Sequence, residues 1–354
     1  MLVQEFLLDD GFLQRWARRA VTVPLYISLC ILFVATLPLL LAIAAVIDIV
    51  SRKRWILCRS ILLFTLYFCC EAIGIVASFV LWVAHAIWPA RRPERFLDWN
   101  FALQRWWAGT LFRGARVILG MEVRLEGIDE LSRGPVIVFI RHASIADTLL
   151  PAMFIANPNG IRLRYVLKRQ LLWDPCLDIV GNRLPNCFVR RELGDSKRVQ
   201  KLIGGLSPRD GVLIYPEGTR FSAQKLARSL AKLADSGNLR LYNRAIRLRN
   251  TLPPRLGGAL SLLGANPGAD VIFCAHEGFE GVVDMRDFLR GSLIGKVIRI
   301  RFWRVAYQEI PIESDRQAEW LFEQWGRLDE WVTLQRAARE DAGTQHSTRQ
   351  KQPA

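Results

Sequence analysis

The sequence lacks the patterns that hold metals, disulfides or nucleotides. It has four histidines, and its seven cysteines show no metal-ligand spacing beside them. No glycine-rich nucleotide fingerprint is present. We therefore predict no metal, redox group or nucleotide as a cofactor. The cysteines are odd in number and lie mostly in apolar runs, which indicates buried free thiols in a reducing compartment: Cys30, Cys58, Cys69, Cys70, Cys176, Cys187 and Cys274.

Acidic residues are scarce beside basic ones. The chain has 33 Asp and Glu against 48 Lys and Arg, and residues 161–255 alone hold 20 basic against 7 acidic side chains. Such a positive field suits nucleic acid, an anionic membrane or phosphate-bearing small molecules. Because no RNP-like, helix-turn-helix or zinc-finger pattern accompanies it, and apolar segments adjoin it, the sequence favours lipid over nucleic acid as a partner.

Long apolar runs are concentrated near the N-terminus. Residues 21–50 contain no Lys or Arg and only one acid, Asp48, and at about 1.5 Å per helical residue they can cross a hydrocarbon core of about 30 Å. Residues 61–88 form a second run, interrupted by Glu71 and His85. The short connector allows only an antiparallel hairpin. We predict that residues 1–95 are an integral membrane anchor, either crossing the bilayer twice or dipping into one leaflet.

Tryptophan and arginine alternate in the next segment, residues 96–120. Trp99, Trp106 and Trp107 lie among Arg105 and Arg113, a mixture that fits a helix in the lipid headgroup layer. The alternative is a helix that packs on the core of the soluble domain. We predict an interfacial amphipathic segment and keep the core-facing alternative open.

Beyond residue 120, short apolar strand patterns alternate with helical ones, which is typical of an α/β domain. We expect strands at residues 122–125, 136–140, 162–167, 212–215, 271–275 and 296–302, and a closing helix at 315–339. The domain then covers residues 121–340. Residues 341–354 are small and polar, and are predicted to be a disordered tail.

One strand pattern runs directly into a histidine. His142 follows residues 136–140, and Asp147 lies five positions further on. Five residues are about 140° around an ideal helix, so the two side chains cannot share a helical face. If His142 lies on the strand-to-helix turn and Asp147 inside the following turn, the carboxylate can orient the imidazole as a base for a hydroxyl. The alternative is a structural histidine with a chance acidic neighbour.

A second strand pattern ends in a polar turn. Gly218 allows a ligand to approach the backbone, Thr219 offers a hydroxyl and N–H donors, and Arg220 offers a planar fork that suits phosphate. The alternative is a helix N-cap with a surface arginine.

Together these two elements resemble the glycerolipid acyltransferase family, which includes the 1-acylglycerol-3-phosphate acyltransferases. The family's first motif is Asn-His-x4-Asp, and its third is Pro-Glu-Gly-Thr-Arg, which stands here at residues 216–220. The resemblance covers roughly residues 121–305. It implies a glycerolipid-acyltransferase-type α/β sheet flanked by helices, behind an N-terminal membrane helical hairpin.

The other two family motifs are matched more loosely. The second motif, an aromatic and an aliphatic residue before arginine, resembles Phe188 followed by Arg190 and Arg191, of which Arg191 aligns best. The fourth resembles the segment that contains Pro254 and Arg255, and the resemblance makes these two residues and Phe188 further substrate-site candidates. In the first motif Arg141 replaces the usual asparagine. That departure makes Arg141 a candidate contact for a different acceptor headgroup.

The resemblance implies direct acyl transfer without a cofactor. His142, oriented by Asp147, takes the proton of the acceptor hydroxyl as its oxygen attacks the acyl thioester. The resemblance assigns the acceptor phosphate to Thr219, Arg220 and Arg191, with Arg190 as a competitor of Arg191. It also places Glu217 and Gly218 among the phosphate-binding residues, with Glu217 ordering the loop. The expected partners are a lysophospholipid, with 1-acylglycerol-3-phosphate first, a lipid bilayer, and a donor that is acyl-CoA or acyl carrier protein. A cytosolic donor implies a catalytic domain on the cytoplasmic face.

Two alternatives remain open at this point. One is the same chemistry on another lysophospholipid or an amino-lipid. The other is a non-catalytic protein that binds anionic membrane surfaces through its basic segment.

Overall fold

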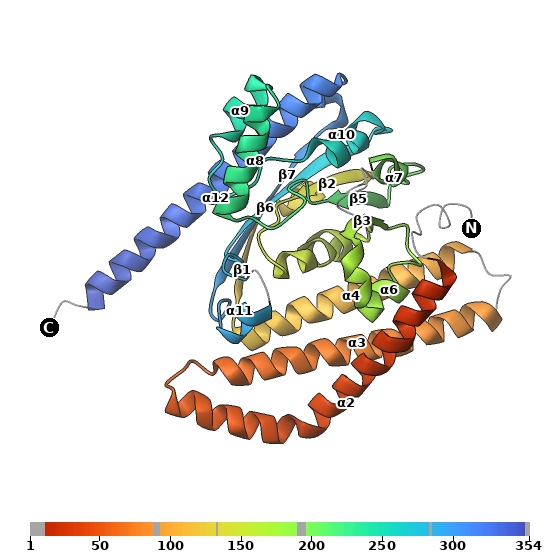
Figure 1. The fold of residues 1–354 in the computed structure, drawn as a ribbon, viewed down its shortest axis with the longest axis vertical. Coiled ribbons are helices and arrows are strands. Elements are labelled where there is room, and N and C mark those ends of the chain that lie inside the picture. The colour runs from red at the N-terminus through yellow and green to blue at the C-terminus, as the bar shows by residue number, and fades with distance from the viewer. Residues whose placement is uncertain (1–10, 88–92, 132–133, 190–195, 283–284, 351–354) are drawn as a thin grey trace.

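A seven-stranded sheet forms the centre of the computed structural model, which describes residues 11–87, 93–131, 134–189, 196–282 and 285–350 (Figure 1). The strand order is β1-β7-β6-β2-β5-β3-β4. The strands β6, β2, β5, β3 and β4 run parallel to one another, whereas β7 is antiparallel to β6 and parallel to β1. The bounds are β1 Glu122–Glu126, β2 Val136–Ile140, β3 Arg162–Lys168, β4 Cys187–Val189, β5 Asp210–Ile214, β6 Asp270–Glu277 and β7 Val297–Val305.

Helices cover both faces of this sheet, which confirms the predicted α/β class. Every residue of β2 is buried, as expected for a central strand with two covered faces. Ile137 and Phe139 pack with α7 (Ser196–Lys201), α10 (Leu256–Gly264) and α12 (Ser314–Gln350). Val136, Val138 and Ile140 point the other way, toward α4 (Pro93–Leu119) and the short helices η2 (Ala146–Leu149) and η3 (Pro151–Ala156).

The remaining described helices are short and lie around the sheet's periphery. They are η1 (Ile128–Leu131), α5 (Asn157–Asn159), η4 (Arg169–Trp173), α6 (Pro175–Ile179), α8 (Ala223–Asp235), α9 (Leu239–Ala245), α11 (Met285–Leu289) and η5 (Tyr307–Glu309).

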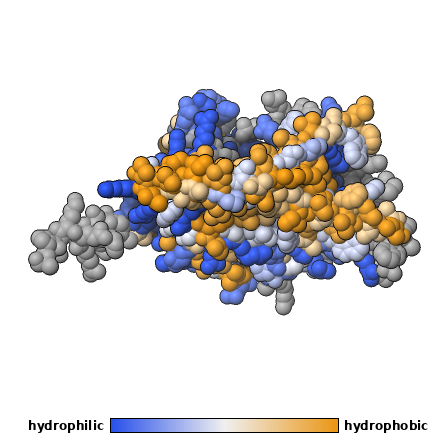
Figure 2. Space-filling view, turned by 90° about the horizontal axis from the view of Figure 1, so that it is seen from below, coloured by the Kyte–Doolittle hydropathy of each residue, from blue (hydrophilic) through white to orange (hydrophobic). Residues whose placement is uncertain are grey.

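The two apolar runs form a helical hairpin, as predicted. Helix α2 spans Phe12–Val50 and α3 spans Ile56–Ile87, and both are long and apolar enough to cross a membrane. Both helices expose large apolar side chains, and the face of the molecule seen in Figure 2 is largely hydrophobic. At about 1.5 Å per residue the helices are about 58 and 48 Å long, which exceeds a hydrocarbon core of about 30 Å.

Helix α3 lies along α4 over most of its length (Figure 1). Near its start, Arg59 donates a hydrogen bond to the carbonyl oxygen of Ile118 at 3.0 Å. In its middle, the Glu71 carboxyl group accepts one from the Trp107 indole at 2.7 Å. Near its end, the His85 ring stacks on Phe96 with 4.4 Å between centroids. The hairpin therefore packs against the α/β domain through α4.

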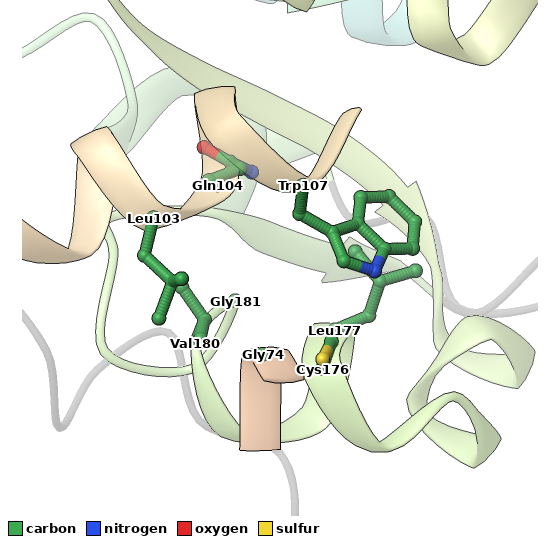
Figure 3. A pocket seen from close by; sticks show the side chains of 8 residues that line it. All are labelled: Gly74, Leu103, Gln104, Trp107, Cys176, Leu177, Val180 and Gly181. Carbon is green, nitrogen blue, oxygen red and sulfur yellow. The ribbon is translucent and has the colours of Figure 1, made fainter. Parts of the chain in front are cut away.

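The junction between hairpin and domain is closely packed. Figure 3 shows Leu103 and Trp107 of α4 facing Gly74 of α3 and Cys176 of α6. The cavity that they line is about 20 Å³, room for little more than one water molecule. A Cβ atom on Gly74 would lie 2.5 Å from the Cys176 sulfur, so a larger residue would push the helices apart. A second contact joins Arg18 and Arg19 of α2 to the buried Asp178 at 2.6 and 2.8 Å.

Helix α4 is the segment for which the sequence left two alternatives. Its buried side includes Phe101, Leu111 and Phe112, and the Phe112 ring packs edge-on against Phe154. The core-facing alternative thus describes one side of α4. Trp99 and Arg113 are exposed on another side, so lipid contact of the interfacial kind stays a prediction for them.

Two elements differ from the sequence prediction. Strand β4 was not predicted, because a three-residue strand carries almost no periodicity. Helix α12 continues to Gln350, into the predicted disordered tail. Residues 335–340 are glutamine, arginine, alanine and glutamate, all good helix formers, and the helix continues from them into the polar residues 341–350. Residues 351–354 lie outside the described structure.

Candidate active site

The carboxyl ends of three neighbouring parallel strands bring the candidate residues together. His142 follows β2, Glu217 follows β5, and His276 stands near the end of β6. Since β2 pairs with both β5 and β6, these ends meet at one edge of the sheet. Ligands of open α/β sheets bind at this edge, outside the carboxyl ends of the strands.

His142 and Asp147 form a hydrogen-bonded pair. His142 Nδ1 lies 3.0 Å from Asp147 Oδ1, and the second carboxylate oxygen accepts the backbone N–H groups of Ala143 at 2.7 Å and Ser144 at 2.8 Å. The strand ends before His142, and the tight helix η2 turns Asp147 back beneath it. This is the arrangement that the sequence spacing required, with the two residues off a common helical face.

The carboxylate of Asp147 is held in its charged form. Burial alone would raise the pKa of this fully buried group, but His142, His276 and the Ser144 amide outweigh burial and lower it. An ionised Asp147 accepts a hydrogen bond from the Nδ1–H group of His142, which leaves the Nε2 lone pair able to take a proton from a substrate. The Tyr215 ring packs beside the imidazole, 4.7 Å between centroids.

Glu217 is buried, and its carboxylate joins two segments of backbone below the surface of the site. Its side chain is 1% exposed, and its two oxygens accept the backbone N–H groups of His142 and Leu252, both at 2.9 Å. Burial raises the pKa of Glu217 to about 8, and the two amide hydrogen bonds oppose that shift. A direct contact between Glu217 and an acceptor phosphate is therefore corrected, while its loop-ordering role fits this geometry.

The loop after Glu217 lies against the His142 segment. The Phe221 N–H donates to the His142 carbonyl oxygen at 3.0 Å, and Lys225 binds the Thr219 hydroxyl at 3.2 Å. Gly218 has φ +64°, and a Cβ atom there would lie 2.8 Å from the Arg255 side chain. Both the left-handed backbone and the close approach require glycine.

Arg220 carries an unfilled donor in this loop. Its Nη1 atom is buried and has no hydrogen-bond partner among the residues that the structure describes. A buried guanidinium nitrogen without an acceptor is costly unless a ligand supplies one, which points to an anion. Gly218, Thr219 and Arg220 thus lie together beside His142, and their binding of an acceptor phosphate stays a prediction.

The other candidate residues from the sequence differ in whether they lie near this loop. Arg255 is exposed and its N–H binds the Pro216 carbonyl oxygen at 2.8 Å, so it borders the same loop, with Pro254 buried behind it. Phe188, at 3% exposed in β4, is separated from β5 by β3 and packs against Gly181. Its proposed contact with substrate is therefore corrected to core packing. Arg190 and Arg191 lie outside the described residues.

Arg141 also requires a correction. Its side chain has no exposed surface, and its guanidinium binds the carboxylate of Glu280 and the carbonyl oxygens of His276 and Asn250. It therefore lies beneath the site and cannot contact an acceptor headgroup. The substitution of asparagine by arginine is matched by Glu280, which the sequence analysis did not connect with it.

This chain is similar to known acyltransferases in sequence. Residues 122–245 match the family model described as Acyltransferase. The 1-acyl-sn-glycerol-3-phosphate acyltransferase epsilon of Mus musculus is 24% identical over 267 residues, 70% of this chain and 70% of that protein. The crystal structure of the 1-acyl-sn-glycerophosphate (LPA) acyltransferase from Thermotoga maritima aligns with 75% of this chain and 98% of its own, at 14% identity and a TM-score of 0.46.

The family match and the curated relative define this chain as an acyltransferase. The matched region contains His142, Asp147 and the loop of Arg220. The family model and the curated relative support the glycerolipid acyltransferase family that the sequence motifs resemble.

Proposed function

We propose that this enzyme transfers a fatty acyl group from an acyl thioester to the free hydroxyl of 1-acylglycerol-3-phosphate, which forms phosphatidic acid. One observation supports the proposal above others: an oriented base and an unfilled buried guanidinium donor stand beside each other at one sheet edge. The base suits a hydroxyl, and the guanidinium suits the phosphate of the same acceptor.

The chemistry follows from these positions. His142 Nε2 removes the hydroxyl proton while the oxygen attacks the thioester carbonyl, and Asp147 stabilises the imidazolium that results. When the carbon–sulfur bond breaks, His142 returns the proton to the leaving thiol. General-base assistance contributes about 10²–10⁴-fold, and the rest comes from holding both substrates in place. The donor is a second substrate, and the transfer uses no cofactor.

The donor's phosphates or acidic surface have a basic helix face available. Helix α8 buries its apolar side through Leu226, Leu230 and Leu233, and it exposes Arg228 and Lys232. We assign this face to acyl-CoA or an acidic acyl carrier protein, because its charge complements either one. A donor made in the cytosol places the catalytic domain on the cytoplasmic face.

The proposal is tested on purified full-length protein with a panel of acceptors. The panel combines lysophospholipids that have phosphate, choline, ethanolamine or glycerol headgroups with amino-lipids, each offered with acyl-CoA and acyl carrier protein. We expect 1-acylglycerol-3-phosphate to give the highest kcat/KM. Preference for another headgroup would overturn the acceptor assignment, and absence of transfer to every acceptor would overturn the function.

Arg220→Lys is expected to weaken acceptor binding. Lysine keeps the charge but loses the planar fork, which costs about 1–3 kcal/mol of phosphate binding. The KM for the acceptor should rise accordingly, with a smaller change in kcat. Arg301→Lys, on strand β7, is the matched control and should leave both constants unchanged. A rise confined to the donor KM would show that the loop binds the donor.

We also propose that the hairpin lies in one leaflet, parallel to the membrane plane. Contacts at Arg59, Glu71 and His85 attach α3 to α4 along its length, and α4 exposes Arg113 and Arg116. Because such a charged helix is costly in hydrocarbon, the helix packed along it cannot cross the bilayer either. The exposed apolar sides of α2 and α3 then enter the lipid.

The placement of the connector tests this arrangement. Residues 51–55 join α2 to α3 and are exposed. We expect Lys53→Cys to react with an impermeant maleimide from the side of the catalytic domain only, with labelled positions mapped by mass spectrometry. Arg228→Cys on α8 marks that side in the same vesicles. Labelling of position 53 from the opposite side would show two complete crossings.

A further inference from the structure

A second histidine contacts the carboxylate that orients His142. His276 stands near the end of β6 and has no exposed surface. Its Nε2 atom lies 2.9 Å from the Arg141 carbonyl oxygen and 3.5 Å from Asp147 Oδ2. His276 has no role in the acyl transfer proposed above, although its ring lies beside Asp147.

The hydrogen bonds fix the protonation of His276. A carbonyl oxygen can only accept, so Nε2 carries the hydrogen. Nδ1 is buried and has no hydrogen-bond partner among the described residues. Burial and the charge of Arg141 lower the pKa of His276, against the opposing effect of Asp147. His276 is thus a neutral donor whose single N–H points at the Arg141 carbonyl and lies beside Asp147.

The peptide bond between Arg141 and His142 is held at both of its polar groups. His276 donates to its carbonyl oxygen, and Glu217 accepts its N–H at 2.9 Å. The paired residues of β2 and β6 end at Ile140 and Cys274, just before this peptide. Beyond the last paired residues of the sheet, the side chains of His276 and Glu217 therefore provide the hydrogen bonds to this peptide.

Arg141 holds His276 in return. Its Nη1 atom donates to the His276 carbonyl oxygen, so the two residues exchange hydrogen bonds between side chain and backbone in both directions. Glu280 compensates the buried charge of Arg141, and Arg336 of α12 lies 3.3 Å from the same carboxylate. Although burial would raise the pKa of Glu280, Arg141 and Arg336 lower it to about 2, so the carboxylate stays charged.

We propose that His276 is a positioning residue of this active site. Its N–H fixes the peptide that carries His142 and lies 3.5 Å from Oδ2 of Asp147, so that carboxylate and imidazole stay aligned. Arg141, which stands where the family has asparagine, holds the backbone of His276 through a hydrogen bond to its carbonyl oxygen. The inference rests on the proposed acyl transfer for its kinetic readout only.

The test compares two amides at position 276. In His276→Gln the side-chain nitrogen occupies a place close to that of Nε2, whereas the shorter His276→Asn cannot reach the Arg141 carbonyl. We expect the asparagine variant to lose about 10- to 100-fold in kcat with both KM values nearly unchanged, since small misplacements of catalytic groups have effects of this size. The glutamine variant should recover most of kcat. His85→Asn, in α3, is the matched control.

A second measurement does not depend on turnover. Diethyl pyrocarbonate modifies unprotonated, accessible imidazoles, and the pH profile of His142 modification, read by mass spectrometry, reports its protonation. In His276→Asn, Oδ2 of Asp147 loses the nearby N–H of His276 and keeps only the Ala143 and Ser144 amides, so Asp147 stabilises the imidazolium more strongly and the profile should move to higher pH. The other groups around the two rings, Tyr215, Arg141 and Glu280, are unchanged in this comparison.

The outcomes separate the two proposals. Wild-type kcat and an unshifted His142 profile in His276→Asn would overturn the positioning role and leave the acyl transfer standing. Equal losses in the glutamine and asparagine variants would assign His276 to general packing and also overturn it. If the wild-type protein transfers no acyl group, the proposed function fails, and the modification profiles still decide the role of His276.

Discussion

His142→Ala is expected to abolish acyl transfer. The imidazole supplies the proton acceptor, and general-base assistance alone is worth about 10²–10⁴-fold. The side chain ends at the sheet edge at 9% exposure and its imidazole hydrogen-bonds to Asp147, so its removal leaves the strand core intact. Turnover with labelled acyl donor and 1-acylglycerol-3-phosphate measures the loss.

Folding and membrane association serve as the controls for this variant. Its thermal unfolding and its flotation with liposomes should match those of the wild type, because neither the hairpin nor the core clusters include His142. His85→Ala should keep full activity. A His142→Ala protein with near wild-type turnover would rule out the base assignment.

Asp147→Asn is expected to reduce kcat by a similar factor for a different reason. Two backbone N–H groups point at one oxygen of this side chain, so the amide oxygen of asparagine must occupy that place. The amide NH₂ then faces His142 Nδ1 as a donor. His142 responds by carrying its hydrogen on Nε2, and in that tautomer it cannot accept the substrate proton.

The kinetics of Asp147→Asn distinguish this explanation from loss of structure. We expect a reduced kcat with little change in either KM, since Asp147 has no exposed surface and contacts no substrate. The remaining rate should increase at high pH, where hydroxide can replace the missing base. Unchanged turnover in this variant would contradict the orienting role of Asp147.

The sequence predicted the sheet well where strands are long and continuous in hydrophobicity. Strand β2 was located at its observed residues, because a strand buried on both faces is apolar throughout. The spacing of His142 and Asp147 also required a turn between them, and η2 provides it. Local patterns thus determined both the strand and the pair that follows it.

The environment of single residues could not be predicted in the same way. Glu217 and Arg141 are polar and stand in motif positions, so the sequence assigned them to substrate. Both are buried, and their partners lie far away along the chain, Leu252 for the first and Glu280 for the second. Such pairings depend on tertiary contacts with no local signal. His276 offered a weak local signal, because it is a second histidine near the end of an apolar strand.

For the proposed lysophospholipid acceptor, the contact between hairpin and domain has a consequence for how the acceptor reaches the site. Arg54 and Ile56 at the connector line one cavity with Glu280 and Gly281, close to Ser144, whose hydroxyl binds the Val282 carbonyl oxygen at 2.8 Å. With α3 packed on α4, the proposed placement of the hairpin in one leaflet fixes the distance from the carboxyl edge of the sheet to the lipid surface. An acceptor can then arrive by lateral diffusion with its acyl chain still among other lipids. The search for substrate becomes two-dimensional, and the effective acceptor concentration is its mole fraction in the bilayer.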